Sequence, residues 1–244
     1  MAARIQVSRA RSRFLLAVHA GLRSACGELG WWPAETKFEI CVGALLTQNT
    51  AWTNVERTLG QLRARGLLSF AALDRLSALQ LAPLLRSAGT FNVKARRLRA
   101  LLDFLGSHFD GRVERMAAEP ADALRAKLLC VKGVGPETAD AIALYAAGAP
   151  LFVVDAYTRR LFTRLGLLSG RESYAQIQAL FHAHLPRDAR LFADYHALIV
   201  EHAKAVCRKR PRCGECVLRR RCAFARNPRE PRKRSGRDSA GVLG

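Results

Sequence analysis

The sequence contains no apolar stretch long enough to span a bilayer, which excludes a membrane-crossing helix. Acidic residues are missing from its start, where Glu28 is the first. This Arg-rich start and the apolar piece Phe14–Ala20 suggest a signal peptide, but the piece is short, His19 interrupts it, and no small-residue cleavage pattern follows. An amphipathic first helix is the better interpretation, so we expect no membrane partner.

Signals for β-strands are scarce as well. Runs of β-branched residues are few, whereas Ala, Leu and Arg, which favour helices, are abundant. Segment 38–48 is apolar nearly all round, as suits a buried central helix. Further helices are expected over 53–65, 69–76, 78–86, 92–108, 119–130, 136–147 and 189–206, and another directly after Asp155. The composition thus predicts an all-α fold, without internal repeats.

The cysteines do not form a disulfide framework, because their number, seven, is odd and three of them are scattered in apolar surroundings: Cys26, Cys41 and Cys130. The other four lie within sixteen residues: Cys207, Cys213, Cys216 and Cys222. Four thiolates so close together fit either zinc or a [4Fe–4S] cluster. The spacing predicts a metal site but not its identity, since zinc ribbons have two close C-x2-C pairs and this segment has one.

Basic residues outnumber acidic ones by 40 to 20, which gives a net charge of +20. Such a balance indicates a polyanionic partner. Half of the residues are hydrophobic, too many for a simple basic arm. From Ala223 onward the chain is rich in Arg, Pro, Ser and Gly, so we expect a disordered basic tail over 223–244.

Two glycines, Gly133 and Gly135, separate the expected helices 119–130 and 136–147. Glycine lets the backbone approach another surface closely, and the following helix begins with free N–H groups and a positive dipole end. With Lys132 beside it, this turn suits a backbone phosphate, although a plain helix–turn–helix corner explains the spacing equally well. The apolar run before Asp155 leads to a helix that this carboxylate would cap.

Taken together, Val131–Leu165 resembles the helix-hairpin-helix motif and the Gly/Pro-then-Asp segment of the endonuclease III superfamily of DNA glycosylases. The resemblance covers roughly residues 30 to 222. It implies a six-helix barrel over 37–149, with the hairpin over 121–147, and a second helical domain from 1–36 and 150–222. DNA would bind between them. The resemblance also implies a [4Fe–4S] cluster on the four clustered cysteines, although the first gap is one residue shorter than is usual in the family.

The resemblance assigns Asp155 the catalytic role, stabilising positive charge on the sugar and orienting water. Glu137 occupies the position of the lysine that, in bifunctional members, attacks the sugar as an amine. A carboxylate cannot form a Schiff base, which predicts base excision without efficient strand cleavage. Independently of any resemblance, an acid in the first turn of a helix is also favoured by the helix dipole.

Further DNA contacts follow from the same resemblance. Gln48 and Asn49 would fill the gap left by a flipped base, and Thr90 and Phe91 would form a second wedge on the opposite strand. The phosphate backbone of DNA would be bound by the hairpin residues Lys132, Gly133 and Gly135.

Three tryptophans surround the central helix: Trp31, Trp32 and Trp52. Core packing and a base pocket explain them about equally. The string WWPAETKFEICVGALLTQNTAW is similar to the 3-methyladenine-excising branch of the superfamily, in which aromatic residues near these positions sandwich the damaged base. An electron-poor alkylated purine would stack well on indole faces.

We therefore expect a monomeric, monofunctional glycosylase that acts on DNA containing damaged bases, in the cytoplasm with the nucleoid, and that holds one [4Fe–4S] cluster. Two alternatives stay open. One is a bifunctional glycosylase and lyase acting on oxidised pyrimidines, and the other is a non-catalytic iron–sulfur DNA-binding module.

Overall fold

The structure is a computed structural model that describes residues 8–227. These residues form helices and short 3-10 turns, with no strand among them, which confirms the predicted all-α fold. The α-helices are α1 (Arg9–Cys26), α2 (Lys37–Leu46), α3 (Trp52–Ala64), α4 (Phe70–Asp74), α5 (Ala78–Leu84), α6 (Phe91–Phe109), α7 (Ala121–Leu129), α8 (Pro136–Tyr145), α9 (Ala156–Leu165), α10 (Tyr174–His184), α11 (Ala189–Ala205) and α12 (Ala223–Arg226). The 3-10 turns are η1 (Arg86–Ala88), η2 (Val113–Ala118), η3 (Cys213–Glu215) and η4 (Arg219–Arg221). None of these helices is long and apolar enough to cross a membrane.

Local signals explain where most helices begin. The Thr36 side chain accepts a hydrogen bond from the Glu39 N–H and caps α2, and Pro136 stands at the first position of α8, where its missing N–H costs nothing. Helix α10 was not among the predicted helices. Its start carries a readable signal, because Ser173 and Gln176 form a reciprocal capping box.

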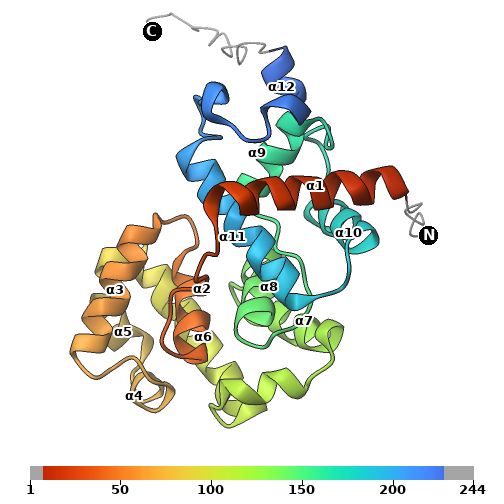
Figure 1. The fold of residues 1–244 in the computed structure, drawn as a ribbon. Coiled ribbons are helices and arrows are strands. Elements are labelled where there is room, and N and C mark those ends of the chain that lie inside the picture. The colour runs from red at the N-terminus through yellow and green to blue at the C-terminus, as the bar shows by residue number, and fades with distance from the viewer. Residues whose placement is uncertain (1–7, 228–244) are drawn as a thin grey trace, which may run out of the picture.

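The N-terminal helix α1 packs against α11, near the C-terminal end of the described chain. Figure 1 shows α1 crossing α11 and α10, away from the group formed by α2 to α6. The Tyr195 hydroxyl on α11 donates to the Leu15 carbonyl at 2.8 Å, and His19 Nε2 lies 2.8 Å from the Asp194 carboxylate. Helix α11 also packs against α8 and α9, so it connects the N-terminal helix to the middle of the chain. The boundaries of the two expected domains stay a prediction.

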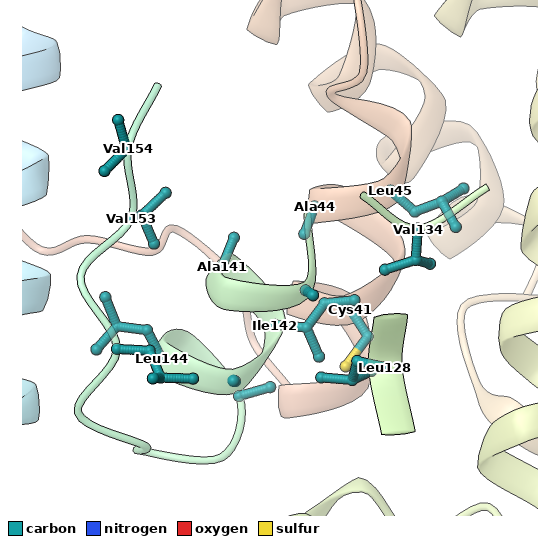
Figure 2. Packing of buried hydrophobic residues seen from close by; sticks show 14 of the residues in the cluster. Cys41, Ala44, Leu45, Leu128, Val134, Ala141, Ile142, Leu144, Val153 and Val154 are labelled. Carbon is teal, nitrogen blue, oxygen red and sulfur yellow. The ribbon is translucent and has the colours of Figure 1, made fainter. Parts of the chain in front are cut away.

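Helix α2 lies at the centre of its group, and its residues from Cys41 to Leu46 are all buried. In Figure 2, Cys41 of α2 faces Ile142 of α8 and Leu128 of α7. Small residues such as Ala141 let α8 approach α2 closely. Burial raises the pKa of the Cys41 thiol to about 12, as expected for an inert core thiol. Burying each large aliphatic side chain contributes about 1.5–3 kcal/mol, so this contact fixes the position of α8.

A buried carboxylate, Asp140 on α8, joins three helices. Its side chain is fully buried and accepts a hydrogen bond from Arg125 Nε of α7 at 2.6 Å. The Tyr174 hydroxyl and Gln178 Nε2, both on α10, each donate to Asp140 Oδ2 at 2.7 Å. A buried charge is tolerated only when it is paired and hydrogen-bonded, and these donors meet that requirement.

The same donors hold the extended segment 151–154, which leads into α9. Gln178 Nε2 also donates to the Phe152 carbonyl at 2.9 Å, and the Tyr174 hydroxyl accepts from the Val154 N–H at 3.3 Å. The Phe152 N–H donates to His182 Nε2 at 2.9 Å. Asp140 therefore fixes, through Tyr174 and Gln178, the path of the backbone up to Asp155.

The first residues of the predicted disordered tail are helical. Residues 223–226 form α12, and the guanidinium of Arg164 lies over the Phe224 ring at 5.0 Å from its centroid. The aromatic side chain packs against the core, which explains why the helix forms in a stretch with few other apolar residues. The rest of the predicted tail, from residue 228, lies outside the described residues.

We expect Asp140→Asn to lower the free energy of unfolding by about 3–5 kcal/mol, because removing one partner of a buried ion pair leaves the other uncompensated. Urea denaturation measures this change. Asp103→Asn is the matched control: Asp103 pairs with Arg99, but 66% of its side chain is exposed, so its loss costs at most about 1 kcal/mol. Equal effects of the two substitutions would show that Asp140 does not organise the fold.

Candidate active site

One pocket of about 550 Å³ gathers most of the predicted site residues. It lies among the segment before α2, the end of α2, the hairpin between α7 and α8, the start of α9 and the inner face of α11. The predicted residues that line it are Trp31, Trp32, Gln48, Asn49, Trp52, Gly133, Gly135, Glu137 and Asp155. Residues from separate parts of the chain thus meet in one cavity, as an enzyme site requires.

Asp155 serves two purposes at once. Its Oδ1 accepts the Thr158 N–H at 2.7 Å and caps α9. Its Oδ2 lies 3.6 Å from Nε2 of His196 on α11. The side chain is largely buried but still lines the pocket. The cap and the pocket position predicted for this residue are therefore compatible.

The two carboxyl groups of the pocket have pKa values shifted in opposite directions. Burial would raise the pKa of Asp155, but the nearby His196 and the hydrogen bond from Thr158 outweigh it, and the pKa is lowered. The pKa of Glu137 is raised by loss of hydration and by the charge of Asp155, against a smaller opposite effect of His196 and Arg159. Glu137 is the more exposed of the two. Two neighbouring carboxyl groups whose pKa values are shifted in opposite directions are typical of acid–base sites.

The hairpin is tied to the end of α2 by side chains. Gln48 Nε2 donates to the Gly133 carbonyl at 3.0 Å and to Thr138 Oγ1 at 2.9 Å. Arg97 of α6 donates to Gln48 Oε1 at 2.5 Å. In this structure, Gln48 therefore holds the hairpin against α2, and its filling of a gap in DNA stays a prediction. Asn49 is exposed beside it, with a left-handed backbone at φ 51°.

The three tryptophans form a contact cluster on one wall. Trp32 packs edge-on to Trp52 with centroids 5.3 Å apart, and Trp31 lies 6.2 Å from Trp52. All three are half-buried and line the pocket, so core packing and pocket lining are combined in the same rings. Lys204, an exposed residue near the end of α11, places its Nζ 5.3 Å from the Trp31 centroid.

Three predicted DNA contacts lie outside the pocket: Thr90, Phe91 and Lys132. Thr90 has a left-handed backbone at φ 36° directly before α6, and Phe91 is half-buried beneath Arg86. Lys132 is exposed before the hairpin glycines.

The two predicted wedge loops are joined by a residue that the sequence analysis did not identify. The buried Lys94 of α6 donates to the Leu46 carbonyl at 2.8 Å, to Thr50 Oγ1 at 2.5 Å and to the Ala88 carbonyl at 2.6 Å. Burial, with the nearby charge of Arg97, lowers the pKa of Lys94 to about 8. Its ammonium thus fixes the spacing between the end of α2 and the η1 turn.

Sequence reasoning also missed pocket residues that lie far from the hairpin in the chain. They are Arg97, Tyr157, Tyr174, His196 and Lys204. For His196 a weak signal exists, because a histidine in the otherwise apolar run of α11 needs a polar partner when it is buried. The partner could not be found from sequence, since Asp155 and Tyr145 belong to other helices.

The four clustered cysteines line one small cavity: Cys207, Cys213, Cys216 and Cys222. Its other walls are largely apolar and include Leu161, Leu165, Leu218 and Phe224, while Arg164 and Arg212 also line it. Within residues 8–227, no three Cys, His, Asp or Glu side chains are grouped as a site for a single metal ion. Four thiols are the ligand set of either a [4Fe–4S] cluster or a structural zinc ion.

Arginines of α9 close the short loop between the first two cysteines. Arg164 donates to Cys207 Sγ at 3.2 Å, to the Arg208 carbonyl at 2.6 Å and to the Lys209 carbonyl at 3.0 Å. Arg160 donates to the Cys207 carbonyl at 2.9 Å. These bonds satisfy backbone groups that a loop of only five residues leaves free.

The sequence was compared with models of known protein families to identify the class of protein to which this pocket belongs. The family described as HhH-GPD superfamily base excision DNA repair protein matches residues 42–187. The chain belongs to this superfamily. The matched segment contains the hairpin, Glu137 and Asp155. This HhH-GPD protein is therefore a DNA glycosylase of base excision repair, as the resemblance predicted.

Two known relatives span most of the HhH-GPD protein. A candidate DNA repair glycosylase of Methanocaldococcus jannaschii is 45% identical over 198 residues, which are 80% of this chain and 90% of the relative. An endonuclease III of Treponema pallidum is 32% identical over 213 residues, which are 84% of this chain and 90% of the relative.

Solved structures resemble it over similar lengths. The 3-methyladenine DNA glycosylase of H. pylori, bound to 1,N6-ethenoadenine, matches with a TM-score of 0.67 at 29% identity, over 80% of this chain and 97% of that one. An endonuclease III in a non-covalent DNA complex matches with a TM-score of 0.75 at 20% identity, over 91% of this chain and 99% of that one. The second likeness confirms the predicted endonuclease III-like fold.

We expect Gly133→Ala to destabilise the DNA-free HhH-GPD protein by about 1–2 kcal/mol or more, because L residues resist its left-handed φ of 89°. An added Cβ would also lie 2.4 Å from Arg97 Cγ. Gly135→Ala is the matched control, since its backbone is extended and its Cβ would meet nothing within 4 Å. Thermal unfolding of both variants checks this, and equal losses would contradict it.

Proposed function

We propose that this glycosylase removes an alkylated purine from DNA by hydrolysis and leaves the sugar–phosphate strand uncut. The observation that supports the proposal is the pair of carboxyl groups in one pocket, Asp155 and Glu137, at the positions where bifunctional relatives carry a carboxylate and an amine. We further propose that it acts as a monomer in the cytoplasm, where its net charge of +20 draws it to DNA.

Asp155 is suited to the hydrolytic step. Its lowered pKa keeps it ionised at neutral pH, and it is largely shielded from solvent, where a negative charge acts strongly on a developing cation. As the C1′–N bond breaks, its electron pair leaves with the base and positive charge develops on the sugar. Water then bonds to C1′, and Asp155 accepts the proton that the water loses.

Glu137 explains why the strand is left intact. Strand cleavage by this class of enzyme needs an amine that forms a Schiff base with the sugar. The residue two positions after Gly135 is a carboxyl group, which lacks the nitrogen that this bond requires.

The tryptophan wall supports an alkylated purine as the substrate. Three indole rings line the pocket, and electron-rich rings of this kind stack well on an extruded, electron-poor base. The H. pylori 3-methyladenine DNA glycosylase, which shares 29% identity, was solved with a modified adenine. An alkylated purine that carries positive charge leaves as a neutral base and needs no proton from the enzyme.

One observation favours a second candidate, a bifunctional glycosylase and lyase. Lys204 lines the same pocket and is an amine on a flexible stem. If its Nζ reached C1′, it would supply the Schiff base that Glu137 cannot form.

We also propose that Cys207, Cys213, Cys216 and Cys222 hold a [4Fe–4S] cluster. The four thiols line one cavity whose remaining walls are largely apolar. The bound group would give structural support, and base removal needs no redox chemistry from it. The surrounding Arg208, Arg219 and Arg220 are exposed and are free to contact phosphates.

The first test is release of methylated purines from DNA treated with dimethyl sulfate. We expect wild-type protein to release them, to leave abasic strands that break only after alkali, and to form no covalent adduct with abasic DNA under borohydride. Asp155→Asn should lower the single-turnover rate at least about 100-fold, because it removes the general base. Its Kd for a duplex with a tetrahydrofuran abasic site should stay within about threefold, since phosphate contacts supply most of the affinity.

An adduct that disappears in Lys204→Met would establish the bifunctional candidate instead. Unchanged release by Asp155→Asn would refute the assigned role of this carboxylate.

A separate test concerns the cofactor. Protein purified without oxygen should be brown and contain about four iron and four sulfide ions per chain. Cys213→Ser should lose most of this iron and unfold at lower temperature. Cys130→Ser changes an exposed cysteine at the end of α7, and this variant should keep the iron content and the unfolding temperature of wild type. One zinc ion per chain, with no iron, would overturn the assignment.

A further inference from the structure

A buried histidine lies behind the proposed catalytic carboxylate. His196 is buried on α11, and its Nε2 is 3.6 Å from Asp155 Oδ2. Its Nδ1 is 2.7 Å from the Tyr145 hydroxyl. Among the described residues, Nε2 has no hydrogen-bond partner at normal distance. Leaving a buried ring nitrogen without a partner is unfavourable, so the orientation of this ring needs an explanation beyond packing.

The protons of this group limit its arrangement. The pKa of Tyr145 is raised far above its usual range, first by burial and then by the charges of Asp155 and Asp194, so its hydroxyl keeps its proton. If that proton goes to the Ala193 carbonyl, 3.2 Å away, Nδ1 must donate to the Tyr145 oxygen. A neutral ring would then turn a bare Nε2 lone pair toward Asp155, and the two would repel each other.

Two arrangements avoid this repulsion. Either the ring is an imidazolium with a proton on each nitrogen, or the Tyr145 hydroxyl donates to Nδ1 and the neutral ring carries its proton on Nε2. In both of them an N–H on Nε2 points at Asp155 Oδ2. The 3.6 Å gap is a few tenths of an ångström longer than a hydrogen bond, and such contacts often tighten when substrate binds.

We infer that His196 is a positioning residue for Asp155, an inference that rests on the proposed function. The Thr158 N–H binds Oδ1, and the His196 Nε2–H faces Oδ2 at 3.6 Å, so the two groups together orient the carboxylate plane. Tyr145 fixes the ring in turn. The carboxylate stays ionised although Glu137 shares the pocket, and its remaining lone pairs are available to water and sugar.

The kinetic test separates rate from binding. On dimethyl sulfate-treated duplex, His196→Leu should lower the single-turnover rate of purine release by about 100-fold, the lower end of what acid–base groups supply. Its Kd for the tetrahydrofuran duplex should change less than about threefold. His196→Gln, whose amide can still donate to Oδ2, should recover most of the rate. The rate of Tyr145→Phe should lie between the rates of His196→Leu and His196→Gln.

His108→Gln is the matched control, because His108 is an exposed histidine on α6 outside the pocket, and its rate should equal that of wild type. Equal losses in the Leu and Gln variants, or a loss confined to affinity, would overturn the inference.

A second measurement needs no substrate. Nuclear magnetic resonance of the ring nitrogens should show a proton on Nε2 of His196 near neutral pH. A ring protonated on Nδ1 alone would refute the pairing, even in an active enzyme. If wild-type protein releases no methylated purine, the proposed function fails, while the ring protonation still decides whether His196 donates to Asp155.

Discussion

The buried charge of Asp140 is the constraint on which the site depends. A carboxylate without solvent contact must be surrounded by donors, and the donors here come from α7 and α10, on either side of α8 in the chain. Two of these donors, Tyr174 and Gln178, also bind the backbone of the extended segment that precedes Asp155. The hairpin helix α8 and the Asp155 carboxylate are thus placed relative to each other by one polar network. Packing of apolar side chains alone would allow the extended segment to slide.

Electrostatics then act at two scales. The whole chain is strongly basic, which attracts DNA at long range, but the pocket contains two carboxyl groups. In the proposed reaction, the positive charge that develops on the sugar would therefore lie near these two carboxyl groups. Because Asp155 is buried, its effect on that cation is less screened by salt and water than the effect of a surface acid would be.

The sequence predicted those parts that are encoded locally. Gly133, Gly135 and Asp155 sit in a short stretch whose turn and capping chemistry can be read directly, and the helices α2 to α9 follow from periodicity and caps. It could not predict contacts that depend on how distant helices pack. His196 reaches Asp155 only because α11 crosses α9, and Lys94 meets three segments only after α6 packs beneath them. The prediction of disorder was wrong for residues 223–226, because the Phe224 ring packs beneath the Arg164 guanidinium of a distant helix.

The position of Lys204 bears on how a base enters the pocket. Its ammonium covers one face of Trp31, and a charged purine would be repelled by it. A cation–π contact at an exposed side chain contributes about 0.5–1 kcal/mol. Stacking of a base on an aromatic ring contributes about 1–3 kcal/mol, so an incoming base can displace the lysine. Once the exposed side chain has moved into solvent, Trp31 presents a free ring face, and the proposed stacking of an electron-poor purine no longer competes with the ammonium.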